Sequence, residues 1–355
     1  MTEINLTDKT LESLKMTMAS RKVLIVGAGG FVGGYLVEEG LSLGCEVWAG
    51  VRKSTKRDRF TDPRIRFVEF DFETPASLSK SMEEAMGEEK WDYVIYNLGA
   101  TKVKRYADFN RINYEYLRSF TIALERAGKM PRKFLYISSL SVTGPFAERT
   151  YEPVDENVIP NPNTRYGVSK HKAELWLQSS AHVPYIIFRC TGIYGPWDKD
   201  YFLMFNSIRQ GFDFGVGYKR QMLTFIYAPD LALAAYMALA KAPTGEIYNI
   251  SEPRVYSQKE FRKIAMRKIG KKFVVPLRFP LPLVKPICAL SEFFGALRGK
   301  PSTLNKDKYK ILKQRNWNCD TRKAEKDFGF TAPTSLEQGV EQTVEWYKGI
   351  NWFKH

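Results

Sequence analysis

A glycine-rich turn between a short apolar run and a helix-like stretch constrains the fold of this chain most strongly. The β-branched run KVLIV (22–26) is followed by Gly27, Gly30 and Gly33, and then by an amphipathic stretch with Leu36 on its apolar face. Such a turn exposes backbone N–H groups beside the positive end of a helix, which suits a dinucleotide pyrophosphate. A tight turn without a ligand is the alternative, but the strand before and the helix after favour the nucleotide.

Apolar runs alternate with helical patterns along the first 190 residues. After the first run, strand-like segments lie at 46–51, 65–70, 92–99, 133–138, 184–189 and 246–250, and helical ones at 75–86, 112–128 and 166–180. Strands that are apolar on both faces are typical of a parallel sheet between two layers of helices. We therefore predict an α/β fold, a Rossmann-like doubly wound parallel sheet with a smaller, mainly C-terminal substrate lobe.

The predicted organisation has three parts: an N-terminal leader (1–20), a dinucleotide-binding domain (21–190, to which about 224–250 returns) and a substrate lobe (191–355). The leader contains acidic residues and lacks the apolar region of a signal peptide. Since no uncharged apolar run reaches about 18 residues, a membrane-spanning helix is not expected.

Charge and cysteine usage narrow the classes of partner. The net charge of +15 favours an anionic partner, namely a phosphorylated cofactor, an acidic membrane surface or nucleic acid. No nucleic-acid-binding module is recognisable, so a nucleic-acid partner is not expected. The four cysteines are far apart and only three histidines occur, which argues against disulfides and a metal site. A reducing, cytoplasmic location is predicted.

The end of the second strand indicates which nucleotide binds. NAD enzymes usually place a carboxylate about 20 residues beyond the glycines, where it binds the ribose 2′-hydroxyl. Here Val51 holds that position, and Arg52 and Lys53 follow it within the basic loop 52–57. Cationic side chains accept a 2′-phosphate, so NADP(H) is the favoured cofactor and NAD(H) the alternative. A solvated basic loop is the other interpretation of these residues.

On seven motifs the chain resembles the extended short-chain dehydrogenase/reductase family, in its epimerase/dehydratase group. They are VGAGGFVGGYLVE, FDFETPASL, NLGATK, YISSLSVTG, YGVSK, FRCTGIYGP and TFIYAPDLALA. The resemblance implies that Asp71 meets the adenine and that the 97–100 segment lines the cofactor. The expected cofactor-binding residues are Gly27, Gly30, Phe31, Val32, Gly33, Arg52, Lys53, Asp71, Phe72, Leu98, Gly99, Ala100, Tyr166, Lys170, Cys190, Gly192 and Ile193.

Tyr166 and Lys170 lie four residues apart on a predicted helix and so project from one face. A phenol with a pKa near 10 is a poor base at neutral pH, and a nearby ammonium is expected to lower that pKa. By resemblance, Ser139 holds the reacting oxygen, Tyr166 transfers the proton, and Lys170 binds the ribose and tunes Tyr166. Asn113 matches a family asparagine with a structural or water-binding role.

The chain departs from its sugar-nucleotide relatives at three places. Leu140 and Ser141 stand where family dehydratases carry Asp-Glu. Gly192 replaces the asparagine that faces the diphosphate, and Leu223 and Thr224 stand where an arginine pairs with phosphate. Lys219 or Arg220 is left as an alternative phosphate partner. The remaining pattern resembles the 3β-hydroxysteroid dehydrogenase and dihydroflavonol reductase branches.

An apolar substrate is therefore expected. Its predicted contacts are Ser139, Ser141, Thr191, Tyr201, Phe202 and Phe205, with Phe212 and Phe214 as further pocket or core residues. The proline-broken apolar segment 276–299 is either a lid or packing between lobes, or a peripheral contact with the inner face of a membrane. The resemblance also implies a homodimer through helices 109–128 and 164–181.

The function predicted from these residues is NADP(H)-dependent reduction of a ketone, or oxidation of the alcohol, on a sterol-, flavonoid- or keto-lipid-like molecule. One alternative is a nucleotide-sugar 4-epimerase or reductase with bound NAD. A second alternative is a non-catalytic NADPH-binding sensor.

Overall fold

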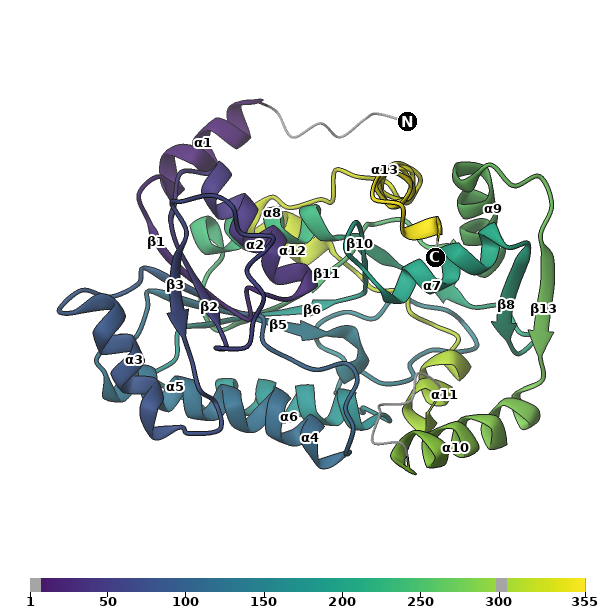
Figure 1. The fold of residues 1–355 in the computed structure, drawn as a ribbon, viewed down its shortest axis with the longest axis horizontal. Coiled ribbons are helices and arrows are strands. Elements are labelled where there is room, and N and C mark those ends of the chain that lie inside the picture. Colours follow the sequence, from purple (N-terminus) through teal and green to yellow (C-terminus); the bar gives the residue numbers. More distant parts are fainter. Residues whose placement is uncertain (1–7, 298–304, 355) are drawn as a thin grey trace.

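A seven-stranded parallel sheet forms the centre of the computed structural model, which describes residues 8–297 and 305–354 (Figure 1). Its strand order is β3-β2-β1-β4-β5-β6-β11. The strands are β1 (Lys22–Val26), β2 (Glu46–Val51), β3 (Arg66–Glu69), β4 (Tyr93–Tyr96), β5 (Lys133–Ser139), β6 (Tyr185–Cys190) and β11 (Glu246–Ile250). The predicted Rossmann-like fold is confirmed, because each of the seven apolar runs forms one strand of this sheet.

Helices cover both faces of the sheet (Figure 1). One face carries α1 (Asp8–Met18), α2 (Phe31–Ser42), α8 (Ala228–Lys241) and α12 (Arg322–Phe328). The other carries α3 (Ala76–Met86), α5 (Tyr116–Arg126) and α6 (Arg165–Ser179). A short helix α4 (Ala107–Asn110) and a π-helical turn (Arg111–Glu115) lead into α5.

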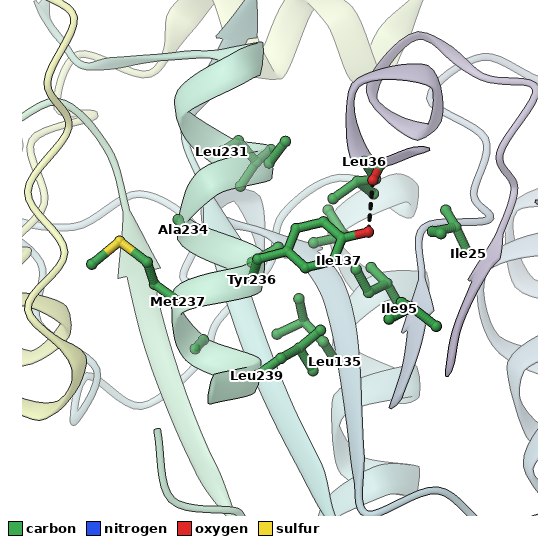
Figure 2. Close-up of a cluster of buried hydrophobic side chains, with 14 of the residues drawn as sticks. Ile25, Leu36, Ile95, Leu135, Ile137, Leu231, Ala234, Tyr236, Met237 and Leu239 are labelled. Atoms are coloured by element: carbon green, nitrogen blue, oxygen red, sulfur yellow. Dashed lines mark hydrogen bonds between the residues drawn. The ribbon is translucent and has the colours of Figure 1, made fainter. Parts of the chain in front are cut away.

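Successive side chains of a strand point to opposite faces of the sheet, and here each face is covered by a layer of helices. Both sets of side chains are therefore apolar. Ile25, Ile95 and Leu135 point towards α8, as Figure 2 shows, whereas their neighbours Leu24, Val94 and Phe134 belong to the opposite cluster. In the layer formed by α1, α2, α8 and α12, the Tyr236 hydroxyl of α8 donates a hydrogen bond to the Leu36 carbonyl oxygen of α2 at 2.7 Å (Figure 2). The hydroxyl group of this buried tyrosine therefore has the hydrogen-bond partner that a buried polar group needs.

The predicted leader contributes a helix to the core. In α1, Leu14 and Met18 are buried against the first layer, with Leu11 partly buried beside them. Their spacing places them on one helical face. Residues 1–7 of the leader lie outside the described residues.

The smaller lobe is built from three two-stranded sheets and several helices. The sheets pair β7 (Gly192–Tyr194) with β10 (Phe225–Tyr227), β9 (Met222–Leu223) with β12 (Tyr256–Ser257), and β8 (Phe212–Val216) with β13 (Val275–Phe279). The helices are α7 (Asp200–Arg209), α9 (Gln258–Ile269), α10 (Leu281–Leu297), α11 (Lys306–Lys313) and α13 (Leu336–Gly349), followed by a 3-10 turn (Trp352–Lys354).

The segment predicted from 276 to 299 forms most of β13 and the helix α10, which contains Pro286. Residues 298 and 299 lie outside the described residues. Across 8–297 and 305–354, the structure contains no helix with the length and apolar character needed to cross a bilayer.

Candidate active site

The glycine turn joins β1 to α2 and depends on the absence of side chains. Gly27 has a φ of +84°, and a Cβ there would lie 2.8 Å from the backbone nitrogen of Leu98. A Cβ on Gly33 would lie 2.2 Å from the carbonyl oxygen of Gly27, so this glycine lets α2 close onto the turn. Two of the three motif glycines are thus required by the turn itself.

The start of α2 has the features of an anion cradle. Gly30 is the N-cap residue and is exposed, and within the described chain no side chain caps it. A Cβ added to Gly30 would meet one atom, the Gly27 carbonyl oxygen, at 3.4 Å, so the space in front of it is open. Phe31 and Val32 supply the first N–H groups of the helix, which favour a phosphate. The turn therefore fits the pyrophosphate of a dinucleotide.

The 97–100 segment links this cradle to α6, the helix that carries the predicted catalytic residues Tyr166 and Lys170. Leu98 lies against Gly27, and a Cβ on Gly99 would lie 3.7 Å from the Lys170 Nζ. Asn113 accepts from the Ala100 nitrogen at 2.7 Å and donates to the Ser169 Oγ at 2.9 Å. Asn113 therefore has a structural role, because its side chain joins this segment to α6.

Ser139 and Tyr166 come together at the carboxyl end of β5. Ser139 ends that strand and caps a 3-10 turn (Leu140–Val142), accepting hydrogen bonds from the nitrogen and Oγ of Ser141 at 3.2 and 3.0 Å. Burial raises the pKa of Tyr166 to about 12, while a side-chain hydrogen bond with Ser139 acts to lower it. Both residues keep part of their surface accessible, as a substrate would require.

Lys170 is buried one turn further along α6, within the same group of residues. Its Nζ donates to the Ile137 carbonyl oxygen at 2.6 Å and lies 4.2 Å from the centre of the Tyr136 ring. Burial lowers the pKa of Lys170 to about 7. The expectation that this ammonium acidifies Tyr166 differs from the structure, in which burial is the dominant effect on both groups.

A buried ion pair supports the back of the site. Glu174 and Arg189 lie 2.8 Å apart and are almost inaccessible to solvent. The Ser138 hydroxyl donates to Glu174 at 2.5 Å, so β5, β6 and α6 are tied together behind Ser139 and Lys170. Breaking a buried pair of this kind by removing one partner is costly.

Asp307 contacts the start of α6 and was not identified from the sequence. Its buried carboxylate accepts from the backbone nitrogens of Arg165 and Tyr166 at 2.8 and 3.3 Å. Its position in the first turn of α11 marks it only as an acidic residue at the positive end of that helix. The separation of more than 140 residues from Tyr166 leaves no local sequence signal for the contact.

The basic loop after β2 lies at the same end of the sheet as the glycine turn. Val51 is buried, so no carboxylate occupies the end of β2. Arg52 and Lys53 are exposed and form no ion pair within the described chain, whereas Arg57 pairs with Glu69. The first two cations are therefore available to a phosphate.

The segment that follows β3 contains one exposed and one buried residue among the predicted cofactor contacts. Asp71 is exposed, and its carboxylate accepts from the Glu73 nitrogen at 3.0 Å. Phe72 is buried and stacks on Tyr116, with ring centres 5.2 Å apart. The two neighbours thus differ in role, since Asp71 can meet a ligand and the Phe72 ring packs in the core.

The stretch after β6 brings other predicted residues near Ser139. Cys190 is buried in register with Ser139 in the neighbouring strand. The Thr191 hydroxyl donates to the Ser251 Oγ at 3.2 Å. A Cβ on Gly192 would lie 2.3 Å from the Tyr201 hydroxyl, and Ile193 is partly buried beside it.

The other predicted substrate residues lie in the core of the small lobe. Phe205 is fully buried and stacks near Phe261, and Phe202 packs against Tyr347 and the C-terminal aromatic residues. Both therefore serve packing. Phe212 and Phe214 are exposed on β8, so they are not core residues of the lobe. No group of three or more His, Cys, Asp and Glu side chains within residues 8–297 and 305–354 could hold a metal ion.

Comparison with known proteins assigns the family. Residues 23–251 match the model of the NAD dependent epimerase/dehydratase family. The chain is 24% identical to a probable dTDP-glucose 4,6-dehydratase of Sinorhizobium fredii, over 94% of each chain. It is also 24% identical to the decarboxylating sterol-4-alpha-carboxylate 3-dehydrogenase of Saccharomyces cerevisiae, over 91% of this chain and 97% of that one.

A solved structure shows the same fold. The dTDP-glucose 4,6-dehydratase of Bacillus anthracis, in complex with NAD, superposes with a TM-score of 0.74 at 18% identity, covering 94% of this chain and 99% of the other. The protein therefore belongs to the NAD-dependent epimerase/dehydratase family and is an NAD(P)-dependent oxidoreductase of the extended short-chain dehydrogenase/reductase type.

Proposed function

We propose that this protein is an NADP(H)-dependent reductase that converts a ketone on an apolar molecule into a secondary alcohol. The observation that carries the proposal is that uncharged side chains, those of Tyr201 and Phe225, surround Gly192. The Tyr201 hydroxyl fills the space that a side chain at position 192 would need. An asparagine at this position, as in sugar-nucleotide relatives, would collide with that hydroxyl.

The second anion-binding position is also uncharged. Leu223 pairs with Tyr256 in the β9–β12 sheet, and the Thr224 hydroxyl donates to the Trp317 carbonyl oxygen at 2.5 Å. Lys219 and Arg220, the remaining candidates for a phosphate, are exposed. Positions 192, 223 and 224 themselves offer no charged partner, and burying a diphosphate against them would be costly, which supports an apolar substrate.

The protonated state of Tyr166 is compatible with a reduction. With its pKa raised to about 12, the phenol is protonated at neutral pH and can donate a proton to an alkoxide that forms beside it. Ser139 would hold the same oxygen by a hydrogen bond. Lys170, close to Gly99, would bind the ribose hydroxyls. When bound, a reduced nicotinamide would supply the hydride to the carbonyl carbon, and with the proton from Tyr166 the ketone would become a secondary alcohol.

A substrate screen tests the proposal. Oxidation of NADPH is followed with long-chain 3-keto lipids, 3-ketosteroids, dihydroflavonols and UDP- or dTDP-sugars, and thermal shift reports binding. We expect turnover with one of the apolar ketones, and no stabilisation by nucleotide sugars. Stabilisation by a UDP-sugar together with formation of its 4-epimer would contradict the proposal and favour the epimerase.

The choice of NADPH is tested at the basic loop. Arg52→Ala/Lys53→Ala should raise the KM for NADPH by roughly tenfold or more, since a hydrogen bond to a charged group contributes about 1.5–3 kcal/mol. The KM for NADH should change little. Arg66→Ala is the control. Arg66 is the first residue of β3, so it lies towards the amino ends of the strands, whereas the basic loop follows the carboxyl end of β2. It pairs with Glu46 at 3.1 Å. Equal use of NADH and NADPH by the unmodified protein would refute the assignment.

A further inference from the structure

The β8–β13 sheet has its apolar side towards solvent. Phe212, Phe214 and Phe279 are 43%, 57% and 40% exposed, and Val275 beside Phe212 is also exposed. The Phe214 ring stacks between the other two, with ring centres 6.1 and 6.3 Å away. Three stacked phenylalanines in contact with water are unusual for a sheet whose other face packs on the protein.

The charged residues of the same two strands point inward. Arg278 lies 2.6 Å from Asp213, and Arg262 of α9 approaches Asp213 at 3.3 Å. All three side chains are about a fifth exposed or less. A soluble sheet normally buries its apolar face and hydrates its charges. The reverse arrangement here leaves the phenylalanine face for an apolar partner.

Helix α10 extends this surface. Leu283, Ile287 and Leu290 are 58%, 48% and 57% exposed and fall on one stripe of the helix, whereas Val284 and Cys288 are buried. β13 passes into α10 directly, and Figure 1 shows β8, β13 and α10 at the same end of the molecule. These exposed apolar side chains of β8, β13 and α10 are called the apolar end below.

Cationic residues border the apolar end. Lys271 and Lys272 precede Phe273, which is 75% exposed, and Lys219 and Arg220 follow Tyr218, which is 74% exposed.

A cavity of about 440 Å³ between α10 and α11 adds to this basic border. It is lined by Lys285, Lys306 and Lys313, together with Glu148. The combination of exposed aromatic and aliphatic side chains with lysines around them is typical of surfaces that bind anionic membranes.

We propose that the apolar end is a peripheral binding surface for a bilayer that contains anionic phospholipids. Its phenylalanines and leucines would enter the boundary between headgroups and acyl chains, and the lysines would contact lipid phosphates. A second copy of this chain is the less suitable occupant, because a symmetric contact would bring each basic border against an identical one. The proposal concerns binding alone and does not depend on the substrate.

Vesicle sedimentation tests the proposal with the full chain. We expect binding to vesicles of phosphatidylcholine with about one third phosphatidylglycerol, and at least roughly tenfold weaker binding to phosphatidylcholine alone or at high salt, as electrostatic attraction to anionic lipid requires. Ile287→Glu should weaken binding by about tenfold or more, because it replaces an exposed aliphatic side chain that would enter the bilayer with a charged one. Ile159→Glu is the matched control, since Ile159 is 85% exposed in a loop outside the apolar end.

Thermal unfolding and NADPH binding of both variants establish that they are folded. The proposal is overturned if the unmodified protein stays in the supernatant with anionic vesicles, or if both isoleucine variants bind equally well. A dimer in sedimentation velocity that Ile287→Glu dissociates, without vesicle binding by the unmodified protein, would assign the surface to a second copy instead.

Discussion

Burial sets the protonation of Lys170 and Tyr166, two of the predicted catalytic residues. Its Nζ lies against Tyr136 and the Ile137 carbonyl oxygen, and its pKa is lowered to about 7 by burial. Burial therefore makes the amine easier to deprotonate than an ordinary lysine, and Tyr166 keeps its proton at neutral pH. A protonated phenol and a buried amine beside it are the features on which the proposed proton donation rests.

The lowered pKa of Lys170 has a measurable effect on stability. The pKa is about 7 in the folded protein against an ordinary value of 10.5, so between these values the unfolded chain binds more protons than the folded one. The stability that involves Lys170 therefore rises with pH across this window, with a slope of up to about 1.4 kcal/mol per pH unit.

Urea unfolding at a series of pH values from neutral to 10 checks this prediction. The free energy of unfolding of the unmodified protein should increase relative to that of Lys170→Met as the pH rises, because the methionine cannot titrate. Parallel curves for the two proteins would show that the amine has an ordinary pKa in the fold.

At the scale of elements, the start of α6 is held from two directions. Thr164 caps the helix by accepting from the Gly167 nitrogen at 2.9 Å. Asp307 of α11 accepts from the backbone nitrogens of Arg165 and Tyr166. The carboxylate also lies at the positive end of the helix, where negative charge is favourable. The small lobe thus helps to position Tyr166.

Removal of the Asp307 carboxylate should affect catalysis as well as stability. Asp307→Ala should lower the free energy of unfolding by about 1 kcal/mol, the usual cost of a lost cap. It should also reduce kcat several-fold while leaving the NADPH Kd nearly unchanged. Asp307→Asn keeps an acceptor oxygen and should retain most of the activity. Equal kcat in all three proteins would show that Asp307 serves stability alone.

The sheet and the catalytic motif were predictable from the sequence because their signals are local. Each strand of the sheet is an apolar run, and Ser139, Tyr166 and Lys170 stand in short motifs beside predicted elements. The paired strands β9 and β12 were not predicted, since two residues each leave no periodicity. Phe212 was assigned to a pocket or its core because the sequence cannot show which side of an aromatic strand is covered.

At the scale of the whole molecule, the two lobes have different chemical surfaces. The sheet presents its glycine turn, basic loop and catalytic residues at the carboxyl ends of its strands, where open α/β sheets bind ligands. The small lobe closes one side of this site and carries the apolar end. The homodimer expected through α5 and α6 stays a prediction, and the exposed Val168 and Leu175 of α6 lie on the helix that it would use.

The central claim is that the phenol of Tyr166 protonates an oxygen held by Ser139 next to the bound dinucleotide. Its most direct test is the rate of NADPH oxidation by Tyr166→Phe with the ketone found in the screen, measured beside the Kd for NADPH. We predict a loss of kcat of at least roughly 10²-fold, the usual contribution of general acid catalysis, with the NADPH Kd within a few-fold of the unmodified protein. Undiminished turnover by Tyr166→Phe would contradict the account.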